Sequence, residues 1–142
     1  MNLATAGCAI EELAHTSEIG LRAHAPALAG LFGCLARAMV ALTGVQADNA
    51  AEPMTLEVDV RAVDVESLLV DWLNEVLFLH EATGIVPQDV TIQALTPEAI
   101  QATLHGRAAR EPGELQIKAV TYHQLQVAQT ADEWIAEVFF DI

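Results

Sequence analysis

One segment of 21 residues constrains the fold more than any other part of the chain. Residues 64–84, DVESLLVDWLNEVLFLHEATG, repeat apolar side chains at three- and four-residue steps, which is the period of an α-helix. Asp64 suits the N-cap, because its carboxylate can accept hydrogen bonds from the free amides of the first turn. Gly84 can take the left-handed conformation that ends a helix. Val70 and Phe78 widen the apolar arc, so this helix is interpreted as core and needs cover, most simply from a sheet.

The first third of the chain predicts two short strands and a second helix. Cys8–Ala14 is expected to be a strand, the polar run 15–18 a loop, and Ile19–Ala25 a second strand because its residues alternate. Pro26 suits the first position of a helix, where its missing amide costs nothing. Apolar side chains then mark one helical face as far as Gly44, a natural stop.

The rest of the chain predicts further strands, at Met54–Val63, Asp89–Leu95, Leu115–Ala128 and Glu133–Ile142. Residues 99–106 fit either a strand or a short helix, and residues 107–114 are expected to be an exposed loop. No repeat or linker appears, so we expect a single domain over residues 1–142, with residues 1–7 loose. This order predicts an α+β fold: a two-layer sandwich with two helices on one face of a mixed, largely antiparallel sheet.

Charge excludes two classes of partner. The formal net charge is -14, from 20 acidic residues against 6 basic ones. Nucleic-acid binding depends on Lys and Arg side chains that neutralise phosphates. We therefore expect no direct contact with nucleic acid and none with an anionic membrane.

The cysteines and the apolar segments indicate a cytoplasmic protein. Cys8 and Cys34 form no CxxC motif and no disulfide framework, so they are expected to be reduced. No signal peptide is evident at the N-terminus. The most membrane-like window, residues 28–42, is about five residues too short for a span and contains Arg37.

Sequence motifs of common enzymes are missing, but three polar clusters interrupt the apolar pattern. No GxGxxG, P-loop, GxSxG, HExxH or EF-hand loop occurs. The clusters are residues 15–18, residues 118–123 with the single lysine and single tyrosine, and Asp141 after an apolar strand. A buried carboxylate needs solvent, a cation or a basic partner. Each cluster also fits a purely structural interpretation as hydrogen-bonded or solvated strand residues.

These clusters resemble the signatures of a known family. HTSEIGLRA resembles HTADIGIRA, the central helix is similar to DLLVxWLNELLYL, KAVTYH matches unchanged, and VFFDI is similar to the family's C-terminus. The family is archease, and the resemblance extends from Ile10 to Ile142. It implies a small α+β sandwich. It also implies a protein cofactor, not an enzyme, that promotes guanylylation and multiple turnover of the GTP-dependent tRNA-splicing RNA ligase.

The resemblance also implies a metal site. The family's metal-binding acid falls on Glu18 and its C-terminal partner on Asp141, with a main-chain oxygen from Ile142. Oxygen ligands of this kind suit calcium or magnesium. Glu18 replaces the usual aspartate, which lengthens that ligand by one methylene.

The residues implied in ligase activation are Lys118, which matches the family's functional lysine, and three further motif positions, His15, Arg22 and His123. Residues 107–114 are shorter than the corresponding family loop and lack its histidine. Two alternatives stay open. A small metal-dependent hydrolase would use the same carboxylates with His15 or His123 as base, and a general chaperone or adaptor would need neither Lys118 nor Asp141.

Overall fold

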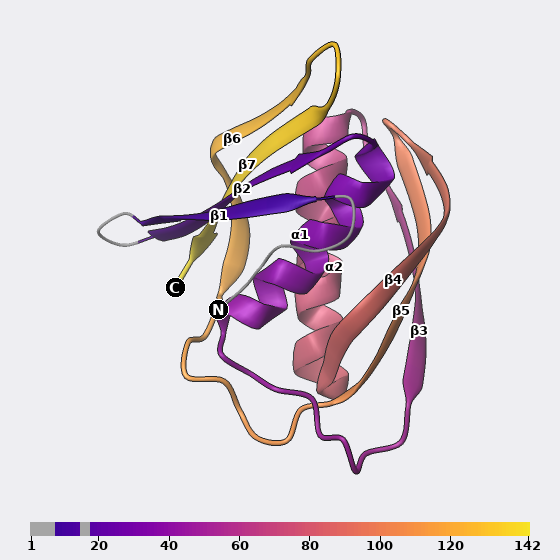
Figure 1. Cartoon of the computed structure of the whole chain (residues 1–142), viewed down its shortest axis with the longest axis vertical. Coiled ribbons are helices and arrows are strands. Elements are labelled where there is room, and N and C mark those ends of the chain that lie inside the picture. Colours follow the sequence, from indigo (N-terminus) through magenta and orange to yellow (C-terminus); the bar gives the residue numbers. More distant parts are fainter. Residues whose placement is uncertain (1–7, 15–17) are drawn as a thin grey trace.

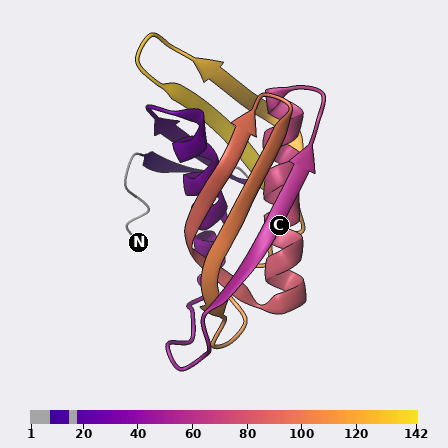
Figure 2. The ribbon, with the colours of Figure 1, turned by 90° about the vertical axis from the view of Figure 1, so that its right-hand side faces the viewer.

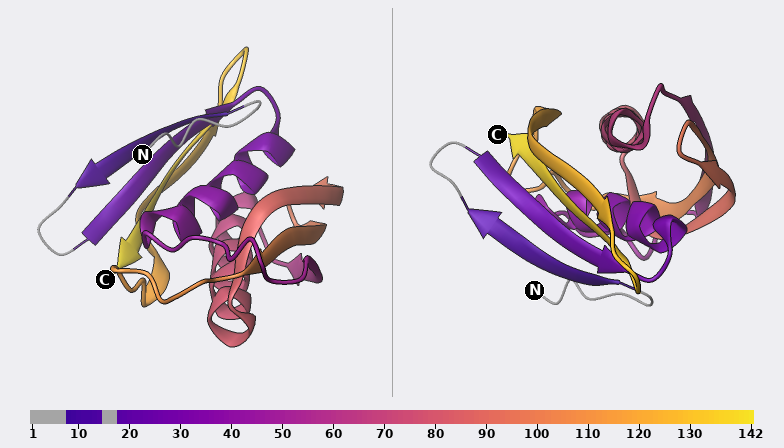
Figure 3. Two further views of the ribbon diagram at one scale, coloured as in Figure 1. Left: turned by 60° about the horizontal axis from the view of Figure 1, so that its bottom comes forward. Right: turned by 90° about the horizontal axis from the view of Figure 1, so that it is seen from above.

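The computed structural model describes residues 8–14 and 18–142, and within them seven strands form two sheets around two helices (Figure 1). Every strand pair in these ranges is antiparallel. The helices lie between the two sheets, as the view from above shows (Figure 3). Each sheet therefore has one face toward the core and one face toward solvent.

The first sheet has the order β1-β2-β7-β6, so the first two strands of the described chain lie beside its last two. Its strands are β1 (Ala9–Ala14), β2 (Glu18–Ala25), β7 (Trp134–Asp141) and β6 (Ala119–Gln129). Side chains alternate between the two faces of a strand. Alternate residues of β2 and β7, such as Leu21 and Phe140, are fully buried against the helices, so their neighbours lie on the outer face.

The second sheet has the order β3-β5-β4. Its strands are β3 (Met54–Arg61), β5 (Ala99–Ala108) and β4 (Ile85–Thr96). Residues 99–106 are thus a strand, which settles the choice between strand and short helix. The predicted loop at 107–114 begins two residues late, because Arg107 and Ala108 still pair with β4.

Helix α2 (Val65–Thr83) confirms the prediction for residues 64–84, caps included. The Asp64 carboxylate accepts the Ser67 N–H at 2.7 Å, and Gly84 ends the helix with φ 81°. Phe78 was expected to widen the buried apolar face of this helix. That expectation was wrong, because its side chain is 59% exposed.

Helix α1 (Leu28–Leu42) packs against α2 and both sheets. It begins at Leu28 with Ala27 as N-cap, two residues after the start predicted at Pro26, and Gly44 follows its end with φ 79°. The indole N–H of Trp72 donates to the Phe32 carbonyl oxygen at 2.9 Å, which joins the two helices in the core. No helix in the described ranges is long and apolar enough to cross a membrane.

The α+β class and the packing of helices against antiparallel strands are confirmed. The expected single mixed sheet is instead divided into two antiparallel sheets. Alternation along a strand reveals which residues face the core, but it carries no information on which strands pair.

The expectation of reduced cysteines was wrong. Cys8 and Cys34 form a disulfide that joins the residue before β1 to the middle of α1. The two cysteines are 26 residues apart in sequence, and only the fold brings them together.

Candidate functional site

Three segments that are distant in sequence form one open pocket at the end of the first sheet. Glu18, Thr121, His123 and Asp141 line it, and its volume is about 400 Å³. Glu18 begins β2, Asp141 ends β7, and the other two belong to β6. The pocket lies on the outer face of the sheet, on the side opposite the helices.

Strand register places the two carboxylates next to each other. Glu18 lies directly across from Asp141 in the β2–β7 pair. Cβ atoms of directly opposed residues are about 5 Å apart, and like charges at that distance repel each other. A cation between the carboxylates would remove this repulsion.

A large irregularity in β6 brings His123 to the pocket. Thr121 pairs with Phe139, yet the next pair along the strand is Gln126 with Glu137, so four residues of β6 oppose one residue of β7. Within this irregularity Gln124 has a left-handed backbone conformation, with φ 55°. As a result, His123 Nε2 lies 3.5 Å from a Glu18 carboxylate oxygen.

The Phe139 ring lies on the outer face of the first sheet, over Gly20 of the neighbouring strand. Phe139 is only 2% exposed although it belongs to the outward set of β7, and its ring lies over Gly20, its partner on β2. A Cβ atom at Gly20 would come within 2.6 Å of that ring. The Phe139 ring therefore occupies the space that a side chain at this position would need.

Helix α2 holds β6 in place through one side chain. The Asn74 carboxamide donates to the Val120 carbonyl at 3.2 Å and accepts the Val120 N–H at 3.0 Å. These two bonds satisfy the backbone of an edge strand where no neighbouring strand does so. Asn74 thereby fixes the strand that carries Thr121 and His123.

Lys118 contacts the site through its main chain. Its N–H donates to the Asp141 carbonyl at 2.7 Å, which closes the sheet at this corner. Its side chain is exposed and does not line the pocket. Within the described residues it forms no ion pair. Ile142 follows Asp141 and is 38% exposed.

Arg22 lies on the same outer face but has other partners. Its guanidinium donates to the Glu137 carboxylate through two nitrogens and to Glu11 at 3.0 Å. Hydrogen bonding and charge from Glu137, followed by weaker contributions from Glu11, raise the pKa of Arg22 further above its ordinary value. Arg22 thus links β2 to β1 and β7 through ion pairs and does not line the pocket. His15 lies outside the described residues.

The pocket provides donors that suit a hard cation. Two carboxylates and the Thr121 hydroxyl supply oxygen, the ligand type of calcium and magnesium. Among the residues that the structure describes, no group of three or more His, Cys, Asp or Glu side chains is arranged to hold a metal ion. A cation held by Glu18 and Asp141 would therefore need main-chain, hydroxyl or water oxygens to complete its coordination.

Of the residues predicted for the site, the structure brings together Glu18, Asp141 and His123. Sequence reasoning missed Thr121 and Asn74 as individual residues, although both lie within the quoted motifs. A sequence motif shows that a residue type is present. It does not show that an amide on α2 reaches a backbone on β6.

Comparisons with known proteins all lead to one family. The model of the archease protein family matches residues 10–142. The chain is 33% identical to the archease of Methanosarcina barkeri over 147 residues, which cover 99% of this chain and 100% of that protein. It is 30% identical to the archease of Pyrococcus abyssi, over 93% of this chain and 97% of the relative.

Two solved structures have a similar fold. The solution structure of Methanobacterium thermoautotrophicum protein 1598 aligns with a TM-score of 0.68 at 24% identity, over 96% of this chain and 99% of that one. The crystal structure of a Thermotoga maritima archease, described as a possible chaperone, aligns with a TM-score of 0.65 at 23% identity, over 93% and 96%. With the family model matched over nearly the whole length, the chain belongs to the archease family.

Proposed function

We propose that this protein is a non-catalytic cofactor that activates a GTP-dependent tRNA-splicing RNA ligase. In this role it promotes guanylylation of the ligase and so permits multiple turnover in RNA splicing and repair. The single observation that carries the proposal is the pocket formed by Glu18, Thr121, His123 and Asp141. Three of the motifs that resemble archease signatures meet there, although they lie more than 100 residues apart at the extremes.

The pocket is proposed to hold a calcium or magnesium ion through Glu18 and Asp141, with a main-chain oxygen of Ile142. Such an ion would supply positive charge near the phosphate groups that rearrange during guanylylation. Lys118, exposed beside this corner, is proposed to contact the ligase or its nucleotide. His123, whose Nε2 lies 3.5 Å from a Glu18 carboxylate oxygen, is proposed to limit the movement of that carboxylate.

Charge supports a protein partner over direct RNA binding. A net charge of -14 repels phosphate backbones, whereas a ligase built to hold RNA presents basic surface to which an acidic protein can dock. The proposed location is the cytoplasm, where thiols reduce accessible disulfides. Burial of Cys34 at 0% exposure restricts access to the Cys8–Cys34 bond there.

A general chaperone is the second candidate, because the Thermotoga maritima relative is described as a possible chaperone. Measuring RNA ligation with substrate in excess over ligase separates the two. A specific activator raises the number of turnovers of a fully folded ligase and increases its guanylylated fraction. Failure to raise either quantity would overturn the proposal, and recovery only of heat-treated ligase would favour the chaperone. GTP or RNA cleavage by the protein alone would favour the hydrolase.

A further inference from the structure

Among residues 8–14 and 18–142, three of the four sheet edges are protected. On β6, the Asn74 carboxamide satisfies the Val120 backbone. On β4, α1 packs alongside, and the strand contains Pro87 and two register shifts. The edge strand β1 is only six residues long and is tied at Cys8 to α1. Proline, bulges, short length and coverage are features that prevent an edge from pairing with another chain.

The fourth edge, β3, has neither a proline nor a register shift, although α2 packs against the strand. Its eight residues pair with β5 in unbroken register from Met54 to Arg61. It contains neither proline nor lysine. In the part of the chain that the structure describes, no strand pairs with its other side, and β3 forms the border of the second sheet (Figure 2). A regular free edge of this length offers backbone donors and acceptors to an added strand.

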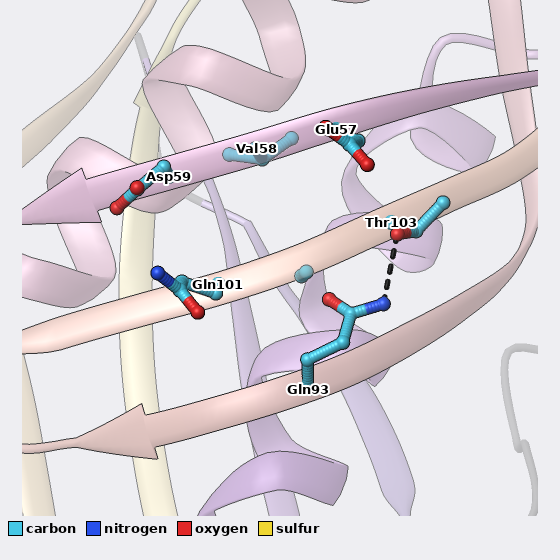
Figure 4. A pocket seen from close by; sticks show the side chains of 7 residues that line it. Glu57, Val58, Asp59, Gln93, Gln101 and Thr103 are labelled. Atoms are coloured by element: carbon cyan, nitrogen blue, oxygen red, sulfur yellow. Dashed lines mark hydrogen bonds between the residues drawn. The ribbon is translucent and has the colours of Figure 1, made fainter.

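The outer face beside this edge is hollowed and carries negative charge. A pocket of about 370 Å³ lies over it (Figure 4). Glu57 and Asp59 line it from β3, opposite Thr103 and Gln101 of β5. Both carboxylates are exposed, and within the described residues neither forms an ion pair. The Gln93 amide donates to the Thr103 hydroxyl at 2.8 Å and so fixes the opposite wall.

We propose that the β3 edge binds an extended basic segment of a partner protein by strand addition. Backbone hydrogen bonds to β3 would supply affinity. Lysine or arginine side chains at alternate positions of the added strand would lie beside Glu57 and Asp59 and supply specificity. Arg61 ends β3 on the same face, and its positive charge would repel a lysine or arginine of the added strand. The charges of the two strands are therefore complementary only in the middle of β3, at Glu57 and Asp59. This surface belongs to the second sheet and does not depend on the proposed ligase activation.

The same charges exclude a second copy of this chain as the occupant. If two β3 strands paired, the carboxylates of both copies would project from the joined sheets near one another. Like charges at neighbouring positions on adjacent strands are destabilising. Each copy also carries a net charge of -14, which opposes association further.

The test uses a blocked eight-residue peptide of alternating lysine and threonine, the length of β3. Titration is followed by amide chemical shifts of the labelled full chain. We expect shifts concentrated in residues 54–61, and we expect the double variant Glu57→Gln/Asp59→Asn to bind about fivefold more weakly. The matched control Glu111→Gln/Glu114→Gln removes the same charge from an exposed loop and should bind as the wild type does.

A second peptide, N-methylated on every residue so that both of its edges are blocked, tests the backbone contacts. It keeps every charge but cannot pair with a strand, so its binding should be lost. Equal binding of both peptides would mean that the site holds only a cationic group, and would overturn the proposal. Shifts elsewhere, equal weakening in the control variant, or self-association of the free protein through residues 54–61 would overturn it as well.

Discussion

Asp141 has different partners for its main chain and its side chain. Its carbonyl accepts the Lys118 N–H at 2.7 Å, while its carboxylate enters the pocket with Glu18. Substitution of the carboxylate should therefore leave the sheet corner intact. This separation makes Asp141 the most informative single residue of the site.

The Asp141→Asn variant should lose most of the stabilisation that calcium or magnesium provides. An ion that binds only the native state adds about 2.7 kcal/mol at 100 times its dissociation constant. Melting temperatures of wild type and variant, with and without each ion, measure this. The exposed Asp132→Asn serves as a control with the same change in charge. An equal response in Asp141→Asn would place the ion elsewhere.

The Asp64 cap predicts a dependence of stability on pH. Hydrogen bonding from the Ser67 N–H lowers the pKa of Asp64 below its ordinary value. A lowered folded-state pKa means that this contribution is present above about pH 4 and is lost as pH falls through the folded-state pKa. Urea unfolding between pH 7 and pH 2 should show a smaller acid loss for Asp64→Asn than for wild type. If the unfolding free energies of the two proteins fell in parallel as pH is lowered, the Asp64 carboxylate would not contribute to the loss of stability in acid.

Some site residues could be foreseen, and others could not. Glu18, Asp141 and His123 follow from the motif resemblance, and the structure places them together. The position of Lys118 could not be foreseen, because the strand predicted from Leu115 begins only at Ala119. Lys118 lies outside the strand, so the alternation of strand residues does not predict where its side chain points.

At the scale of elements, periodicity predicted best where it was long and uninterrupted. Helix α2 repeats its apolar positions over five turns and has both caps, so its bounds were correct. Strand β6 was expected to be continuous, but four of its residues oppose one of β7. This irregularity reverses the alternation of β6 from Gln126 onward, and residues 122–125 contain no glycine or proline that would mark it in the sequence.

The two hydrogen bonds from Asn74 of α2 to the Val120 backbone of β6 should contribute measurably to stability. Asn74→Ala leaves the Val120 N–H and carbonyl without partners in a partly buried place, which costs about 1–3 kcal/mol. Urea unfolding measures the loss, and hydrogen exchange at Val120 should accelerate locally. Asp71→Ala, exposed on the same helix, should change neither. Unchanged exchange at Val120 would mean that Asn74 does not hold the strand.

At the scale of the whole molecule, the disulfide and the division into two sheets were beyond the sequence. Cys8 and Cys34 meet because α1 packs beneath the first sheet, a tertiary fact that two isolated cysteines do not reveal. Strand alternation likewise gave the buried face of each strand and not its neighbours. The class of fold, set by the order of helices and strands, was nevertheless correct.

Removing the disulfide should destabilise the oxidised protein. Cys8→Ser opens a link between residues 26 apart, for which loop-closure entropy gives about 3.5 kcal/mol. The variant should unfold at lower urea than oxidised wild type. Both proteins should behave alike after treatment with excess dithiothreitol, which reduces the bond to two thiols. Identical curves without reductant would show that the bond adds nothing to stability.

We propose that the pocket at the end of the first sheet is what activates an RNA ligase. The most direct test is ligation with substrate in excess, comparing wild type, Asp141→Asn and the control Asp132→Asn. The wild type and the control should both sustain repeated turnover, whereas Asp141→Asn, folded as judged by its melting curve, should leave the ligase near a single round. Full stimulation by Asp141→Asn would contradict the account.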